Sequence, residues 1–224
     1  GRLALLPADG RAVVCERLTY LSPAKLMRLT NALREIERRG INGDVLEFGV
    51  ALGGSSVLLA RHATPKRQFH GFDVFGMIPP PTSAKDDVKS RERYRSIVNG
   101  KAHGIGKDTY YGYRSDLFES VCATLARYGR PVGDGRVFLH KGLFETSWSS
   151  YDRSPIAFAH IDCDWYDPVR FCLNAVFPRL APEGIIVLDD YHDYGGCRTA
   201  TDEFLSEHPG LFSIDNGDNL ILRG

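Results

Sequence analysis

The sequence has no long hydrophobic run, and this excludes one broad class of protein. Its apolar stretches are short, such as Ile185 to Leu188, whereas a membrane-spanning helix needs about 20 consecutive apolar residues. The opening Gly1-Arg2 also carries no signal-peptide pattern. We therefore expect no membrane partner.

The sequence also lacks a net charge, because 28 lysine and arginine residues balance 28 aspartate and glutamate residues. A chain that binds nucleic acid or an anionic membrane surface usually carries an excess of basic residues. We expect neither partner, and a small-molecule substrate instead, with charge acting locally. The composition leaves the oligomeric state open, a homo-oligomer included.

Paired cysteines are a third absence. The chain has five cysteines, an odd number, and their spacing matches neither a disulfide framework nor a zinc-binding motif. Such usage is typical of a reducing compartment, so the sequence predicts a cytoplasmic protein. The five residues are Cys15, Cys122, Cys163, Cys172 and Cys197.

Strand-like and helix-like segments alternate along the chain, and no linker or repeat divides it, so we expect one domain over residues 1–224. The alternation is typical of a parallel, doubly wound sheet. A turn at residues 215–218 predicts a C-terminal antiparallel hairpin. The expected fold is an α/β, Rossmann-like, mostly parallel seven-stranded sheet. The predicted strands are residues 45–48, 68–73, 136–140, 156–162, 184–190, 211–214 and 219–222.

Two segments stand outside this alternation. Residues 1–43 are a predicted N-terminal helical segment, in which Ser22-Pro23 begins an amphipathic helix. The stretch between the second and third strands is far longer than a loop and a crossover helix need. We interpret residues 76–113 as an inserted lid, within which the charged run 85–95 is expected to be a solvated helix.

The loop that follows the first strand indicates a nucleotide-like cofactor. It contains glycines at positions 49, 53 and 54, and it brings backbone close to a ligand while opening a helix. Asp73 ends the next strand, where a carboxylate can hold two ribose hydroxyls. The dinucleotide fingerprint G-x-G-x-x-G is absent, because Ala51 stands where its second glycine belongs. The loop, preceded by the acidic Glu47, therefore favours S-adenosylmethionine over a nicotinamide dinucleotide, and a merely structural turn is a third interpretation.

Carboxylates follow two other predicted strands at their carboxyl ends. Asp162 ends the strand 156–162, and Asp189 and Asp190 end the strand 184–190. If those strands are neighbours, the three carboxylates converge where open α/β sheets bind ligands. Like charges placed so close together need a proton or a hard cation.

Several motifs, taken together, resemble the macrocin O-methyltransferase family from about Thr19 to Phe204. Members of that family are class I S-adenosylmethionine-dependent enzymes that methylate sugar hydroxyls of natural products with a bound magnesium ion. The matching motifs are Glu47-x-Gly49-Val50-x-x-Gly53-Gly54, Phe72-Asp73-Val74-Phe75, Lys141-Gly142-x-Phe144-x-Thr146, His160-Ile-Asp162-x-Asp164-x-Tyr166, Asp189-Asp190-Tyr191 and Cys197-Arg198-x-Ala200.

The resemblance implies roles for individual residues. Asp162, Asp189 and Asp190 become the magnesium ligands. The sequence departs from the family pattern at Val74 and at His192-Asp193, and these departures bear on the substrate. The implied S-adenosylmethionine contacts are Tyr20, Glu47, Gly49, Val50, Gly53, Ser55, Asp73 and Val74.

A catalytic base is needed beside the metal ligands, and Asp162 is counted as catalytic with them. Asp164 is the first candidate because it lies two residues beyond Asp162, although it could equally serve as a turn or helix-cap residue. His192 is the second candidate because imidazole titrates near neutrality, although an exposed loop histidine would fit the same position. His160 lies inside an apolar strand and is expected to be a core residue.

The predicted activity is Mg²⁺-dependent transfer of a methyl group from S-adenosylmethionine to a sugar hydroxyl of an antibiotic-type metabolite. The metal would orient the hydroxyl and stabilise the developing alkoxide. A catechol-type acceptor is the closest rival because a vicinal aromatic diol would bind the same ion. Two different classes of function also fit the glycine loop, a non-catalytic S-adenosylmethionine-binding module and a nicotinamide oxidoreductase.

Overall fold

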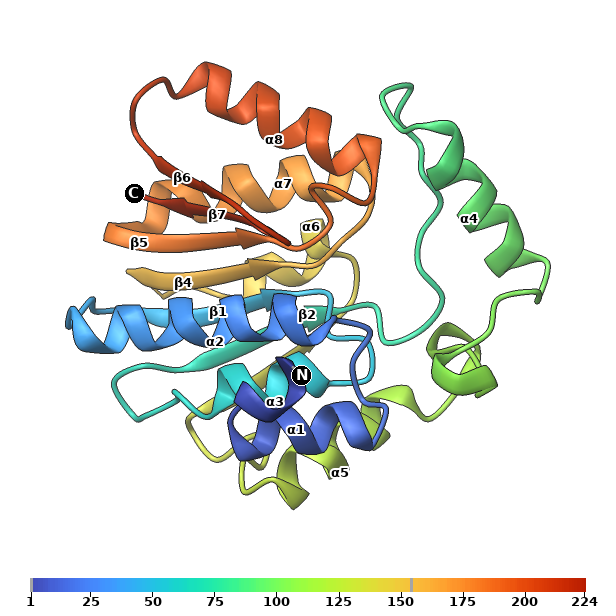
Figure 1. Ribbon diagram of the computed structural model, residues 1–224, viewed down its shortest axis with the longest axis horizontal. Coiled ribbons are helices and arrows are strands. Elements are labelled where there is room, and N and C mark those ends of the chain that lie inside the picture. The colour runs from blue at the N-terminus through green and yellow to red at the C-terminus, as the bar shows by residue number, and fades with distance from the viewer. Residues whose placement is uncertain (1, 154) are drawn as a thin grey trace.

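The computed structural model describes residues 2–153 and 155–224, so Gly1 and Ser154, which fall within the predicted domain, lie outside the described residues. Seven strands in this part of the chain form one sheet in the order β3-β2-β1-β4-β5-β7-β6 (Figure 1). Strands β1 to β5 pair in parallel, and β7 is antiparallel to both β5 and β6. The predicted fold is confirmed. The strands are β1 (Asp44–Phe48), β2 (Phe69–Asp73), β3 (Val137–Lys141), β4 (Ile156–Ile161), β5 (Leu180–Leu188), β6 (Ser213–Asn216) and β7 (Leu220–Arg223).

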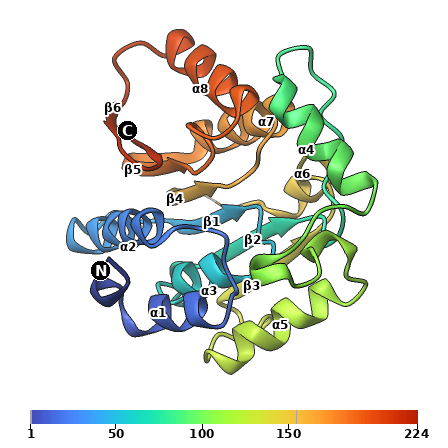
Figure 2. The ribbon, with the colours of Figure 1, turned by 45° about the vertical axis from the view of Figure 1, so that its right-hand side comes forward.

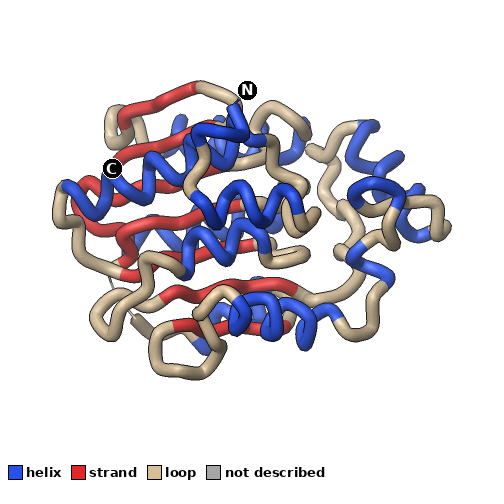
Figure 3. Tube along the Cα trace, turned by 60° about the horizontal axis from the view of Figure 1, so that its bottom comes forward, coloured by secondary structure: helices blue, strands red, loops and turns tan. Residues whose placement is uncertain are grey.

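Helices cover both faces of the sheet (Figure 3). Successive strand side chains point to opposite faces, and a separate apolar core lies on each face. Helices α1, α2, α3 and α5 pack on one core, and α6, α7 and α8 pack on the other. No helix among the described residues is both long and apolar enough to cross a membrane. The helices are α1 (Ala8–Cys15), α2 (Pro23–Arg38), α3 (Gly54–Ala60), α4 (Val88–Val98), α5 (Leu117–Arg127), α6 (Phe144–Ser147), α7 (Tyr166–Val176) and α8 (Gly195–Glu207).

The strand order reverses between β1 and β4. The chain passes from β1 outward to β2 and β3, and then returns to place β4 on the other side of β1. A crevice opens at the carboxyl ends of the strands at such a reversal. The pairing register places Glu47 beside His160, and Asp189 follows β5 next to them. The polar side chains of three neighbouring strands therefore meet at this edge.

Helix α2 begins as predicted and delivers a charged side chain to the same edge. The Ser22 hydroxyl accepts a hydrogen bond from the Lys25 amide at 3.2 Å, and Pro23 occupies the first helical position. The buried face packs on the sheet because apolar residues recur at helical spacing. Lys25 is thereby held in the first turn, beside the end of β5. The buried apolar residues of α2 are Leu26, Leu29, Ala32, Leu33 and Ile36.

Residues 76–113 stand beside the strand ends and cover neither face of the sheet (Figure 2). They contain α4 and two short 3-10 turns, Ile105–Lys107 and Tyr111–Tyr113. Three buried side chains give this insertion a small core of its own, separate from the two large ones. These side chains are Ile97, Ala102 and Tyr110.

The expectation that residues 85–95 are simply solvated is wrong at two positions. Asp86 is 5% exposed and Ser90 is fully buried. The reason is that the N-terminal end of α4 packs against the start of α8, which periodicity within the segment itself does not reveal.

Candidate active site

Two adjoining cavities open at the carboxyl ends of the central strands. The first has a volume of about 300 Å³ and is lined mainly by charged and polar residues, and the second has a volume of about 380 Å³ and is mainly apolar. Together they form one elongated site with a polar and an apolar end. The residues that line both cavities are Gly49, Asp73, Tyr111, Asp162 and Asp164.

The glycine loop is held in place by Asp73. One Asp73 oxygen accepts hydrogen bonds from the amides of Val50 at 2.8 Å and Ala51 at 3.0 Å, and the other accepts from the Phe75 amide at 2.7 Å. Burial raises the pKa of Asp73, and these three amides oppose the rise. Gly49 has φ +95°, and a Cβ there would lie 2.0 Å from the Asp162 carbonyl oxygen. The loop therefore needs glycine where it approaches the end of β4.

An N-terminal segment crosses the other side of this loop. The Gly54 amide donates to the Leu18 carbonyl oxygen at 2.9 Å, and a Cβ on Gly54 would lie only 2.3 Å from that oxygen. Residues 18–21, called the strap below, line the first cavity as a result. The Tyr20 ring contacts the Tyr111 ring edge-on, with centroids 5.8 Å apart. The strap and the insertion thus meet over the glycine loop.

The structure separates the predicted donor contacts into two groups. Gly53 is not among the lining residues described for either cavity, because it takes φ +85° at the start of α3 and faces Val121. Glu47 is fully buried behind the loop and is not among them either. The remaining predicted contacts do line a cavity: Tyr20, Gly49, Val50, Ser55 and Asp73 the first, and Val74 the second.

Glu47 belongs instead to a buried chain of charged groups. Its carboxylate accepts a hydrogen bond from the Ser56 hydroxyl and lies 3.0 Å from His160 Nδ1. His160 Nε2 lies 3.9 Å from Asp189 Oδ1. Burial alone would lower the pKa of His160, but the carboxylates of Asp189 and Glu47 raise it to about 10. His160 is therefore buried as expected, but it lies between two carboxylates that favour its protonated form, and it is not an ordinary core residue.

The three predicted metal ligands come together. Asp162, Asp189 and Asp190 each offer one carboxylate oxygen, and these oxygens lie within 4.8 Å of one another. Burial, followed by repulsion from Asp189, raises the pKa of Asp162 to about 8. Burial and the neighbouring Asp164 also raise the pKa of Asp190 well above its ordinary value. The cluster is therefore under charge repulsion that a bound cation would relieve.

Lys25 partly balances this charge, and sequence reasoning missed it. Its ammonium donates to Asp189 Oδ2 and to the Asp189 carbonyl oxygen, both at 2.9 Å, and to Asp193 Oδ2 at 2.7 Å. Burial would lower the pKa of Lys25, but the two carboxylates raise it above its ordinary value. The contact joins residues 164 positions apart, and no local pattern signals it.

The cluster fits a hard divalent cation. Asp189 Oδ1 and Asp190 Oδ2 are buried and have no hydrogen-bond partner among the described residues. Lys25 binds the other oxygen of Asp189, so it leaves Oδ1 available. Carboxylate oxygens are the ligands that Mg²⁺ prefers, and Mg²⁺ usually keeps some positions for water or substrate. The donor set and its unpaired oxygens are therefore those that such an ion requires.

The two candidate bases lie in different places. Asp164 lines both cavities, and burial raises its pKa to about 6. His192 is exposed, and its ring packs edge-on against Tyr191. It is not among the lining residues described for the cavities. The geometry therefore favours Asp164 as the base and gives no support to His192.

The insertion contributes lining residues that the sequence did not single out. Lys89 and Arg93 lie one helical turn apart on α4 and both line the first cavity. Tyr194, just before α8, lies beside them. The only signal in the sequence was the charged run 85–95, which is compatible with a solvated helix as well.

Curated relatives and solved structures resemble the chain over most of its length. An 8-demethyl-8-(2,3-dimethoxy-alpha-L-rhamnosyl)-tetracenomycin-C 4'-O-methyltransferase from Streptomyces olivaceus is 25% identical over 83% of this chain and 67% of its own. Mycinamicin III 3''-O-methyltransferase from Micromonospora griseorubida is 26% identical over 85% and 71%.

Among solved structures, the O-methyltransferase NovP has a TM-score of 0.75 at 19% identity, over 92% of this chain and 81% of its own. The calicheamicin methyltransferase CalS11 has a TM-score of 0.64 at 19% identity, over 99% and 88%. These likenesses show a class I O-methyltransferase fold. The sequence pattern of the macrocin O-methyltransferase (TylF) family matches residues 15–218. The chain therefore belongs to the macrocin O-methyltransferase family and is an O-methyltransferase.

Proposed function

We propose that this enzyme transfers a methyl group from S-adenosylmethionine to a sugar hydroxyl of an antibiotic-type natural product, with the help of Mg²⁺. The names of the two curated relatives specify O-methylation of a rhamnosyl tetracenomycin and of mycinamicin III. The observation that carries the proposal is the cluster of Asp162, Asp189 and Asp190 beside the glycine loop. That arrangement can hold an oxygen-binding cation and a methyl donor side by side.

The elongated site supports a place for the donor. Two structural neighbours, an O-methyltransferase from Bacillus cereus and TomG from Streptomyces achromogenes, are described in complex with SAH and with SAM. In this chain Asp73 would accept hydrogen bonds from the ribose hydroxyls. Val74 and Phe144 would pack on the adenine in the second cavity. Gly49 and Ser55 would line the methionine end in the first.

The residues around the acceptor would then carry out the chemistry. A divalent cation bound at the carboxylates would supply Lewis-acid activation, which lowers the pKa of a hydroxyl. Asp162, Asp189 and Asp190 would orient that hydroxyl toward the donor. Asp164, with a pKa of about 6, is mostly ionised at neutral pH. It would take the hydroxyl proton as the new carbon–oxygen bond forms and the sulfur–carbon bond breaks.

Family membership narrows the range of functions. It removes the nicotinamide oxidoreductase and the non-catalytic module. A catechol-type acceptor stays an outcome of the test, because the same carboxylates would hold an aromatic diol.

All five cysteines are free. The cytoplasmic location and a homo-oligomeric state stay predictions.

Substrate trials test the proposal directly. S-adenosylhomocysteine release is measured with a panel of rhamnosylated and other glycosylated metabolites and with catechols, each with Mg²⁺ and with a chelator. We expect turnover of at least one glycoside, lost with the chelator and restored by Mg²⁺. Turnover of catechols alone would contradict the sugar acceptor, and turnover unchanged by the chelator would contradict the metal requirement.

A further inference from the structure

Two consecutive carboxylates, Asp86 and Asp87, are among the contacts that join the insertion to the rest of the enzyme. Asp86 Oδ1 accepts a hydrogen bond from the Tyr166 amide at 2.8 Å, and Asp87 Oδ2 accepts one from the Gly195 amide at 2.8 Å. The other oxygen of Asp87 accepts from the Ser90 amide at 2.8 Å. Tyr166, Gly195 and Ser90 lie in the first turns of α7, α8 and α4. The pair therefore ties three helix N-termini together.

Two of these helices have no cap of their own. The residues that precede α7 and α8 are Trp165 and Tyr194, and neither makes a side-chain capping hydrogen bond. The first amides of a helix lack intrahelical partners, and its positive dipole end favours an anion. Asp86 and Asp87, which come from a distant segment, provide the side-chain acceptors for these amides that the residues before α7 and α8 do not provide.

The glycines at the start of α8 are explained by the same contact. A Cβ on Gly195 would lie 2.7 Å from Asp87 Oδ2, and a Cβ on Gly196 would lie 2.1 Å from Asp86 Oδ1. Neither glycine has a positive φ. Close approach of the two carboxylates, and at Gly196 also of the Tyr166 backbone nitrogen at 2.7 Å, is therefore the reason for glycine at both positions.

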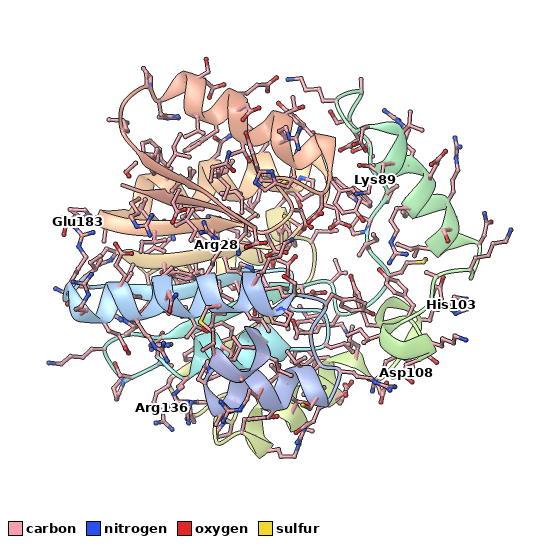
Figure 4. All side chains as sticks on the ribbon, viewed as in Figure 1. Arg28, Lys89, His103, Asp108, Arg136 and Glu183 are labelled. Carbon is pink, nitrogen blue, oxygen red and sulfur yellow. The ribbon has the colours of Figure 1, made fainter. Side chains whose placement is uncertain are left out.

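Each capped helix begins directly after a loop that carries active-site acids. Helix α7 follows Asp162 and Asp164, and α8 follows Asp189 and Asp190. The Lys89 ammonium adds a further link, because it donates to the Asp193 carbonyl oxygen in the second of these loops. Figure 4 shows Lys89 on the part of α4 nearest the strand ends.

We propose that Asp86 and Asp87 are positioning residues that latch the 76–113 insertion over the active site and hold the two acidic loops at their working separation. The insertion has its own small core, and Tyr111 also joins it to the large core that α1, α2, α3 and α5 cover, so opening of the latch would loosen the insertion without releasing it. Asp86 Oδ2 is buried without a partner among the described residues, and an unpaired buried polar atom costs free energy in the latched state. The effect on catalysis rests on the proposed function, but the latch itself does not.

Asp87→Ser separates the two roles of Asp87. Serine still caps α4 well, but its single, shorter oxygen cannot also reach Gly195. Gly195→Ala breaks the same contact from the opposite side, because the three atoms nearest the new Cβ all belong to the Asp87 side chain. Glu92→Gln is the matched control, because it also removes a carboxylate from α4, at an exposed position within the same helix.

Hydrogen exchange of the full chain with S-adenosylhomocysteine and Mg²⁺ provides the first test. In both latch variants we expect the amide of residue 195, the Tyr166 amide and the insertion to exchange together, faster by roughly tenfold or more, as for loss of a hydrogen bond to a charged group. The Glu92 variant should exchange as wild type does. Faster exchange at Gly195 alone would show a local cap and overturn the latch.

Calorimetry with Mg²⁺ and steady-state kinetics provide the second test. Both variants should lose roughly tenfold in Mg²⁺ affinity and in kcat/KM for the acceptor. Because both break the same contact, the double variant should lose no more than the more impaired of the two single variants. Unchanged values in variants that exchange faster would overturn the positioning role. A wild-type enzyme that binds no Mg²⁺ would instead contradict the proposed function, while the exchange result still decides the latch.

Discussion

At the level of single residues, the carboxylates of the active site lie close enough to repel one another strongly. Asp162 and Asp190 are both held in a buried acidic cluster, and Lys25 and His160 supply positive charge to the neighbouring Asp189. The three aspartates could be predicted from their places at strand ends. Lys25 and the link through Glu47 could not, because pairing between distant elements leaves no local periodicity.

Asp190→Asn should abolish Mg²⁺-dependent turnover and stabilise the fold. The substitution removes a metal ligand, so we expect a loss of activity of more than roughly 100-fold. A carboxyl whose pKa is raised on folding destabilises the native state above its ordinary pKa, so the neutral amide should raise the Tm at pH 8 without metal. Activity assays, Mg²⁺ calorimetry and thermal melts check this, with the exposed Asp152→Asn as control. A lower Tm would contradict the charge argument.

His70 should make the protein sensitive to mild acid. It is buried between His140 Nε2 at 2.9 Å and Gln68 Oε1 at 3.1 Å, and burial lowers its pKa to about 4. The unfolded chain therefore binds more protons below pH 6.5, and stability should fall by up to about 3 kcal/mol as the pH drops toward 4. Denaturant melts across this range should show a flatter profile for His70→Gln. The same change at exposed His192 should leave the profile as in wild type.

At the level of elements, local chemistry determined what was predictable. The Ser22-Pro23 start of α2 was readable because a cap and a first-turn proline act within a few residues. Strand β6 begins at Ser213, two residues later than predicted, because an exposed edge strand has little alternation to define its start. The capping of α7 and α8 by Asp86 and Asp87 could not be predicted from local sequence, because these caps come from another part of the chain.

The contact between the strap and α3 should be essential to the donor end of the site. In Gly54→Ala the new Cβ would lie 2.3 Å from the Leu18 carbonyl oxygen, so backbone must move. We expect a loss of about 1–3 kcal/mol in the free energy of unfolding, as for overpacking, and weaker binding of S-adenosylhomocysteine. Denaturant melts and calorimetry measure both. Gly76→Ala, where the nearest atom to a Cβ is the Val74 carbonyl oxygen at 4.0 Å, an ordinary van der Waals distance, is the control and should change neither.

For the whole molecule, the sequence specified the sheet better than it specified what surrounds the active site. Alternating apolar strands and helices determine a doubly wound sheet, and its strand reversal places the site. The insertion was recognised only by its length, because its packing depends on a few polar contacts and on the small core around Tyr110. Gly53 was predicted to contact the methyl donor, but its left-handed backbone forms the turn before α3 and does not line the cavity.

The meeting of Tyr20 with Tyr111 has a consequence for the kinetics of turnover. The two rings come from the strap and from the insertion, and both line the first cavity, so their contact forms a bridge across its wall. We predict that spent donor departs when this contact opens, so that the opening slows its release. Tyr20→Ala should speed S-adenosylhomocysteine dissociation by roughly 2-fold to 10-fold, the worth of one aromatic pair. Comparison of that rate, measured by stopped flow, with kcat would show whether methyl transfer or product release limits turnover.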